Sequence, residues 1–135
     1  MQFTIPFHIE NYIAGKFIGP LSGKFIDNVN PATGEIYGQI PDSNEKDVEL
    51  AVTFAQKAFT EWAATAAETR FKILNKIAGL IDENIEALAL AETNDNGTPL
   101  WLSKKVDIYR AAANFRFFAT GLMHFASESH AMENK

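Results

Sequence analysis

The stretch Glu92–Phe118, ETNDNGTPLWLSKKVDIYRAAANFRFF, decides how the helical part of the chain is divided. Its first part, Asn94–Pro99, combines polar turn-forming residues with a glycine and a proline, a pattern that ends one helix before another begins. Its second part is a helical run in which Arg110 stands among apolar residues. The stretch therefore predicts a helix boundary followed by a helix with an unusual charged position.

The composition of the whole chain is typical of a globular protein. It has 135 residues, of which 47% are hydrophobic and 21% are charged, with a net charge of −5. The acidic balance argues against a nucleic-acid partner or an anionic membrane surface, since both require a basic patch. We see no signal peptide and no apolar run near the ~20 residues of a membrane span. A cytoplasmic protein is therefore expected.

The chain contains no cysteine. This excludes a disulfide framework, a thiolate zinc site and a cysteine nucleophile within these residues. Glycine-rich phosphate-binding motifs are also absent, so no dinucleotide-binding loop is expected in this stretch. His8, His124 and His130 do not form pairs at metal-ligand spacing, and surface or core-edge positions are expected for them.

On the N-terminal side, residues 10–41 predict a small antiparallel β-meander. Ala14-Gly15 offers a tight hairpin turn, and the cluster Asn30–Glu35 is a second dense turn signal. Residues 36–40 alternate as a strand that stops at Pro41. Such a meander is too thin to bury a core by itself.

Residues 43–121 predict three helices. The first follows the N-cap oxygens of Asp42–Asn44 and has an apolar stripe from Val48 to Trp62. The second begins at Thr65–Glu68, which has the form of a capping box, and runs to about Thr93. The third covers roughly residues 100–120. We expect the helices to pack on one another, which gives an α+β fragment with a tail, or the start of an oligomerisation strand, at 122–135.

Two side chains of the opening stretch have a structural and a functional interpretation. Asp95 is either part of a helix C-cap and turn or a cation ligand beside backbone carbonyls. Arg110 is either one half of an i,i+3 surface ion pair with Asp107 or a binding group for a carboxylate or phosphate. Arg116 lies about 240° further round the helix than Arg110, so the two do not face the same ligand.

Four motifs, taken together, resemble a known family. They are Asn11–Phe17 (NYIAGKF), Val29–Glu35 (VNPATGE), Asp95–Pro99 (DNGTP) and Asn114–Ala119 (NFRFFA). In this order and at these separations they are similar to the N-terminal part of the NAD(P)-dependent aldehyde dehydrogenases. The resemblance covers residues 11–120 and implies an N-terminal segment of an α/β, Rossmann-like fold. Thr98 stands where the family usually has lysine.

Within this family, Asp107–Ala111 and the NFRFFA run most resemble the 2-aminomuconic and 2-hydroxymuconic semialdehyde dehydrogenases. The resemblance implies that Arg110 holds the substrate carboxylate and that Phe117 and Phe118 line a substrate tunnel. Tyr109 departs from the pattern, because the relatives often have proline there. It adjoins Arg110 and could change how that side chain is aimed.

The resemblance also implies groups beyond these side chains. It implies a monovalent cation held by the Asp95 side chain and the backbone oxygens of Asn28 and Val29. It implies NAD as the cofactor, bound mostly outside this segment, and a homo-oligomer. The catalytic cysteine and general-base glutamate of the family would follow residue 135. No catalytic residue is therefore expected here, and the segment alone is expected to be inactive.

Two other functions remain open on the sequence. One is an aldehyde dehydrogenase for neutral or aromatic aldehydes, in which Arg110 is structural. The other is a truncated binding or oligomerisation module, whose exposed strand edges and helix faces pair with a second copy.

Overall fold

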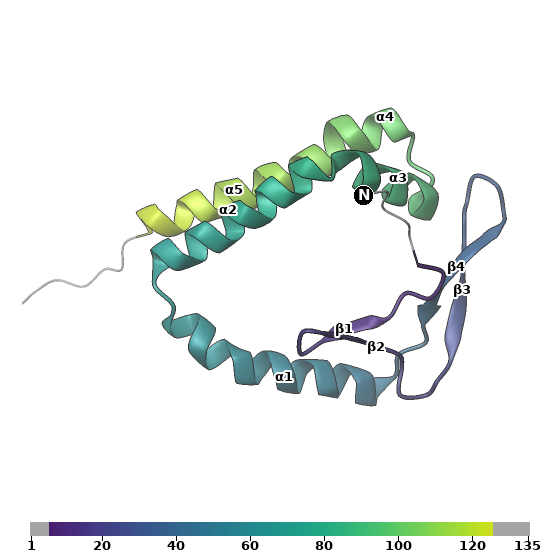
Figure 1. Cartoon of the computed structure of the whole chain (residues 1–135), viewed down its shortest axis with the longest axis horizontal. Helices are drawn as coiled ribbons and strands as arrows, with labels where there is room; N and C mark the ends of the chain where they lie inside the picture. Colours follow the sequence, from purple (N-terminus) through teal and green to yellow (C-terminus); the bar gives the residue numbers. More distant parts are fainter. Residues whose placement is uncertain (1–5, 126–135) are drawn as a thin grey trace, which may run out of the picture.

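The computed structural model describes residues 6–125, so most of the expected tail at 122–135 and all of His130 lie outside the described residues. Four strands precede the helices, which confirms the α+β order. The elements are β1 (Asn11–Ile13), β2 (Lys16–Ile18), β3 (Phe25–Val29), β4 (Ile36–Pro41), α1 (Glu45–Ala64), α2 (Ala67–Glu83), α3 (Ile85–Asn96), α4 (Leu100–Leu102), the π-helical segment η1 (Ser103–Ile108) and α5 (Tyr109–His124). Figure 1 shows α1 and the α2–α5 pair as two arms that diverge from the turn between α1 and α2. The β3–β4 strands lie at the open side between the arms, and β1–β2 lies beside α1.

The strands form two separate antiparallel hairpins, β1–β2 and β3–β4, instead of the continuous meander expected from the sequence. Pro20 lies between the hairpins and has no N–H for a strand ladder. Its carbonyl instead accepts the Gly23 N–H at 2.8 Å, which closes a turn. The Ala14-Gly15 turn is confirmed: both residues have positive φ, at 54° and 78°, as a tight two-residue hairpin turn requires.

Helix α1 begins where the sequence predicts. Asn44 is the N-cap, and its side chain accepts the Lys46 N–H at 2.9 Å. Asp47 is buried and accepts the backbone N–H of Asn44 at 2.9 Å and of Leu21 at 2.8 Å. One carboxylate therefore caps α1 and joins it to the loop before β3. The capping box expected at Thr65 is wrong, because Ala66 is the N-cap of α2 and makes no side-chain cap.

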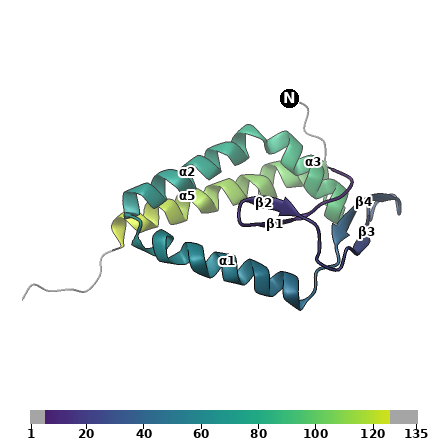
Figure 2. The same ribbon diagram turned by 60° about the horizontal axis from the view of Figure 1, so that its bottom comes forward.

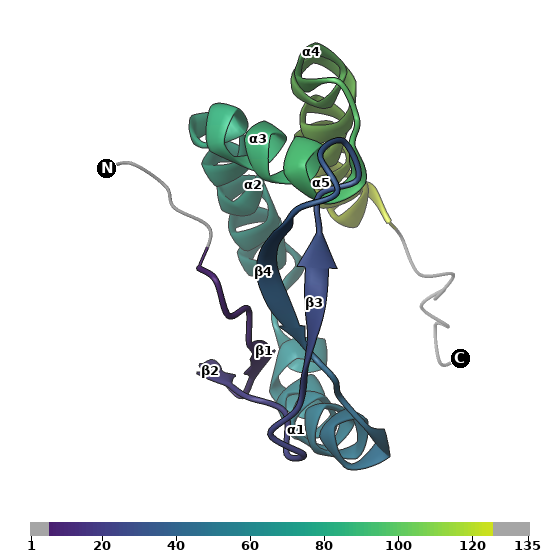
Figure 3. The ribbon, with the colours of Figure 1, turned by 90° about the vertical axis from the view of Figure 1, so that its right-hand side faces the viewer.

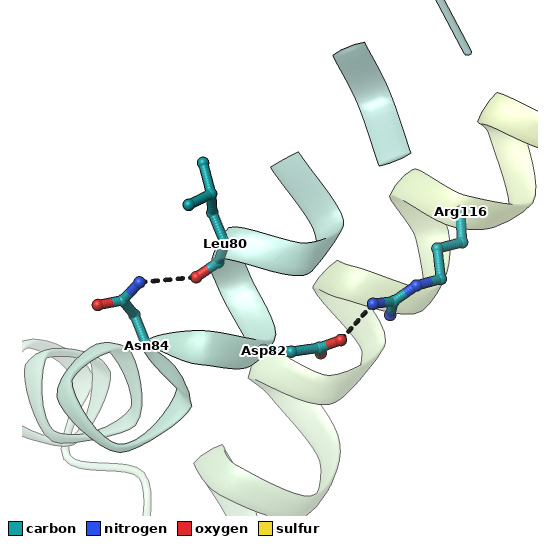
Figure 4. Close-up of polar contacts among 4 residues, drawn as sticks. All are labelled: Leu80, Asp82, Asn84 and Arg116. Carbon is teal, nitrogen blue, oxygen red and sulfur yellow. Dashed lines mark hydrogen bonds and ion pairs between the residues drawn. The ribbon is translucent and has the colours of Figure 1, made fainter. Parts of the chain in front are cut away.

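The long second helix expected from the sequence is divided at Asn84. The Asn84 side chain donates to the Leu80 carbonyl at 2.8 Å (Figure 4). Its backbone N–H donates to the Ile81 carbonyl at 3.2 Å. The backbone at Asn84 is not helical, with φ −113° and ψ 18°. Asparagine competes for helical carbonyls in this way, so the chain turns here and α3 begins.

Helices α2 and α5 pack side by side, as Figures 1 and 2 both show. The contact uses small residues: Ala78 of α2 and Ala112 and Ala119 of α5 are fully buried. Arg116 of α5 forms an ion pair with Asp82 of α2 across the same contact (Figure 4). This confirms that Arg116 and Arg110 serve different faces.

Helix α1 does not join this pair, which corrects the expectation that the long helices pack together. Its main neighbour is β1, and its apolar side chains Val48, Val52, Phe59 and Trp62 are exposed. The buried apolar residues of the described part are one isoleucine and four alanines, so its core is small. No helix within residues 6–125 is long and apolar enough to cross a membrane.

Candidate functional site

Arg110 lies in the first turn of α5, on the side away from α2. It is two positions before the buried Ala112, which places it about 200° round the helix from the α2 contact. Its side chain is 69% exposed, and its Nη2 lies 3.7 Å from Asp107 Oδ1. The i,i+3 ion pair predicted as the structural interpretation is therefore present, and the rest of the guanidinium faces outward.

Two adjoining hollows run along α5, one lined in part by α3 and the other in part by α2. The first, of about 350 Å³, is polar and is lined by Glu92, Asp107, Ile108, Arg110, Ala111 and Asn114. The second, of about 290 Å³, is mostly apolar and is lined by Leu74, Ala111, Asn114, Phe115 and Phe118. Because they share Ala111 and Asn114, a polar end that holds Arg110 together with Glu92 and Asp107 continues directly into an aromatic one. Within the polar end, the Arg110 guanidinium is the group that can bind an anionic end of an elongated ligand.

The two predicted aromatic residues have different positions. Phe118 lines the apolar hollow, whereas Phe117 lines neither hollow. Phe118 is 65% exposed and Phe117 is 72% exposed, and their rings meet edge to face with centroids 5.3 Å apart. The structure thus brings Phe118 close to the residues around Arg110, and Phe117 contacts it from outside.

The π-helical segment η1 ends two residues before Arg110, and no sequence signal predicted it. A π turn contains one more residue than an α turn, so it shifts every later side chain round the helix axis. Ser103 in this segment is completely buried, and its Oγ has no hydrogen-bond partner among the described residues. The segment ends at Ile108, and the backbone N–H of the next residue, Tyr109, donates to the Val106 carbonyl. A proline at 109 could not make this bond.

Asp95 lies at the C-terminal end of α3, and the tip of the β3–β4 hairpin reaches that end (Figure 3). Its Oδ1 accepts hydrogen bonds from Tyr37 Oη at 2.6 Å and from Asn28 Nδ2 at 2.9 Å. Gly97 follows with φ 77° and ends the helix, as predicted. Asp95 therefore joins the helix end to the hairpin.

Tyr37 is the member of this cluster that sequence reasoning missed. Asn28 pairs with Gly38 and Val29 pairs with Ile36, so Tyr37 is the extra residue of a β-bulge. A bulge re-aims side chains, and here the tyrosine reaches a residue 58 positions away. An alternating strand pattern gives no sign of such an insertion.

The surroundings of Tyr37 and Asp95 shift the pKa values of both side chains. Burial, followed by the hydrogen bond to Asp95 and its negative charge, raises the pKa of Tyr37 to about 12. The hydrogen bonds from Tyr37 and then Asn28 lower the pKa of Asp95, against the opposing effect of burial. Asp95 is thus held as a carboxylate and Tyr37 as a neutral phenol.

Of the predicted cation ligands Asn28, Val29 and Asp95, the side chains of Asn28 and Asp95 are joined by a hydrogen bond from Asn28 Nδ2 to Asp95 Oδ1. The predicted ligand atoms of Asn28 and Val29 are backbone oxygens, which this bond does not involve. Within residues 6–125 no group of three or more His, Cys, Asp or Glu side chains gathers to hold a metal. The monovalent-cation site stays a prediction.

Of the two described histidines, His8 stacks on Phe25 at 5.1 Å and His124 ends α5.

Comparisons with known proteins agree on one family. Residues 17–135 match the model of the aldehyde dehydrogenase family. The chain is 43% identical over 126 residues to a 2-aminomuconic semialdehyde dehydrogenase of Danio rerio and 40% identical to that of Homo sapiens. In both cases the match covers 93% of this chain and 26% of the relative. The chain therefore spans about a quarter of the length of these relatives.

A solved structure supports the same conclusion. An aldehyde dehydrogenase from Bacillus cereus in complex with NAD⁺ superimposes with a TM-score of 0.81 and 33% identity, over 84% of this chain and 23% of that one. Sequence and fold thus agree over nearly the whole chain, which confirms the resemblance found in the four motifs. The chain belongs to the aldehyde dehydrogenase family.

Proposed function

We propose that the full-length enzyme carrying residues 1–135 oxidises a carboxylate-bearing semialdehyde to the acid, and that Arg110 binds the substrate carboxylate. The observation that carries this proposal is the polar hollow at Arg110 that adjoins the apolar hollow at Phe118. A semialdehyde has one carboxylate and one aldehyde, joined by a carbon chain. Arg110 would hold the first, and Phe118 would pack against the chain.

The names of the relatives support this class of substrate, because the Danio rerio and Homo sapiens proteins are 2-aminomuconic semialdehyde dehydrogenases. NAD, when bound, would accept the hydride from the aldehyde carbon while water supplies the new oxygen. We propose that its site and the catalytic nucleophile lie outside residues 1–135, which contain no cysteine. The segment alone would then be inactive, and the enzyme a cytoplasmic homo-oligomer.

The test is Arg110→Ala in the full-length enzyme, assayed with a straight-chain ω-oxo acid and with the uncharged aldehyde of the same length. Loss of a charge-assisted bidentate contact should lower kcat/KM for the oxo acid about 10- to 100-fold. The neutral aldehyde should change little, because it makes no ionic contact with Arg110.

Arg116→Ala is the matched control, because Arg116 lies on the same helix but pairs with Asp82. It should leave the ratio between the two substrates unchanged. Equal losses on both substrates with Arg110→Ala would contradict the carboxylate contact and favour an enzyme for neutral or aromatic aldehydes. A chain of residues 1–135 that forms a stable oligomer by light scattering and ignores NAD would favour the non-catalytic module.

A further inference from the structure

The polar hollow at Arg110 contains two acidic side chains, Glu92 and Asp107. Glu92 is already engaged, since its Oε1 accepts the Asn96 side-chain N–H at 2.7 Å. Asp107 has a different position: its Oδ1 lies 3.7 Å from Arg110 Nη2, and its side chain is only 29% exposed. Asp107 is therefore the carboxylate that stands directly beside the proposed anchor.

The Asp107–Arg110 pair is weak enough to be displaced. At 3.7 Å it is a single ionic contact, longer than a hydrogen bond, and the guanidinium is mostly exposed. Exposed pairs of this kind contribute between zero and about 1 kcal/mol. A ligand carboxylate can approach the guanidinium through two parallel N–H groups, which is a stronger contact. A ligand can therefore bind while Asp107 remains nearby.

A fixed negative charge beside the anchor still weakens the attraction for an anion. Asp107 is less exposed than Arg110, so solvent screens its charge less well. We infer that Asp107 tunes substrate specificity by competing with the substrate carboxylate for the Arg110 guanidinium. This inference rests on the proposed function of Arg110. It makes Asp107 a positioning residue that acts through Arg110 and does not touch the reacting atoms.

An alternative role for Asp107 predicts the opposite result. If its carboxylate orients Arg110 productively, its removal should weaken binding of the anionic substrate. If it competes, its removal should strengthen that binding. The sign of the change in KM therefore separates the two roles.

The experiment is Asp107→Asn in the full-length enzyme, which removes the charge and keeps the shape. We expect KM for the ω-oxo acid to fall about two- to fivefold, the size expected for an exposed ion pair. KM for the uncharged aldehyde of the same length should stay constant. The gain should shrink in high salt, because the competing charge is then screened. Asp107→Glu, which keeps the charge, should retain a KM near that of the wild type.

Two further variants complete the test. Glu86→Gln removes an acidic partner of Lys104 outside the hollow, so it should not change the ratio between the two substrates. Asp107→Asn added to Arg110→Ala should have no further effect, because the two residues act as one unit. A KM that rises or does not change with Asp107→Asn would overturn the inference. If Arg110→Ala still affects only the oxo acid in that case, the proposed function stands without it.

Discussion

The two ends of Glu92–Phe118 hold their charged side chains in opposite ways. Asp95 accepts two hydrogen bonds on one oxygen, from residues on a distant hairpin. Arg110 has one ionic contact at 3.7 Å, to a residue three positions away on its own helix. The first charge is tied into the fold, whereas the second leaves most of its hydrogen-bonding capacity free.

This difference separates a structural residue from a candidate binding residue. A carboxylate whose Oδ1 accepts two hydrogen bonds joins two segments, and its loss would leave the Tyr37 hydroxyl without an acceptor, while Asn28 would keep only its bond to Tyr37 Oη. An exposed guanidinium contributes little to folding and remains available for a ligand. We therefore expect mutations at the Asp95 end to change stability, and mutations at the Arg110 end to change substrate selection.

The largest effect on stability is expected for Gly97→Ala. Gly97 has φ 77°, and a Cβ there would lie 3.0 Å from Pro31 Cγ. The left-handed conformation and the crowding together should cost about 2 kcal/mol. Chemical denaturation would measure the loss. Gly79→Ala is the control, since its Cβ would meet nothing within 4 Å. In mid-helix it should stabilise by about 0.5–1 kcal/mol.

Asp95→Ala should have the next largest effect, about 1–2 kcal/mol, because two hydrogen bonds lose their charged acceptor at a partly exposed site. The loss should be local. Hydrogen exchange of the backbone amides of β3 and β4 should become about 5- to 30-fold faster, with little change in α2. Uniformly faster exchange would show that Asp95 supports the whole fold and not this one contact.

The stability that the Tyr37–Asp95 hydrogen bond contributes should depend on pH at both the acidic and the alkaline extreme. Folding raises the pKa of Tyr37 from 10.0 to about 12, so its contribution is complete below pH 10 and is lost as the pH rises toward 12. Folding lowers the pKa of Asp95, so its contribution is present at neutral pH and is lost as the pH falls below the ordinary value of 3.8. Denaturation curves at several pH values would measure both. Tyr37→Phe should remove the alkaline loss, and an unchanged alkaline curve in that variant would assign the loss elsewhere.

The smallest effect on stability is expected for Arg110→Ala. Its side chain is 69% exposed, and its one ion pair is long. The free energy of unfolding should change by less than about 0.5 kcal/mol. Arg116→Ala should cost more, because the Asp82–Arg116 pair joins α2 to α5. Thermal unfolding of both variants would test the comparison, and a larger loss with Arg110→Ala would make Arg110 a structural residue.

Local signals in the sequence predicted the element boundaries that depend on neighbouring residues. The Asn44 cap, the Ala14-Gly15 turn and the Gly97 helix end were all predicted correctly, because each uses contacts within a few positions. The division of the second helix at Asn84 was not predicted, although its asparagine-to-carbonyl bond is also local. A single asparagine within a continuous apolar stripe does not indicate that its side chain will hydrogen-bond to a helical carbonyl and end the helix there.

The candidate site was predicted only in part. Arg110 and its partner Asp107 follow from their i,i+3 spacing, and the structure brings them together. Tyr37 was missed because its bond to Asp95 joins positions 58 apart and depends on a β-bulge. Phe117 and Phe118 were expected to act together, but only Phe118 lines the hollow next to Arg110.

The sequence alone determined the order of strands and helices, the family, and the presence of an arginine near an aromatic run. Only the tertiary structure decided which way those side chains face. The π-helical segment Ser103–Ile108 sets the rotation of α5, because its extra residue per turn shifts Arg110 relative to α4. Packing of alanines against α2 then turns Arg110 away from α2, toward the hollow that it lines with Glu92 of α3. Sequence spacing determines that Asp107 and Arg110 are neighbours on one helix. Packing between helices determines that this pair faces the hollow and not the contact with α2.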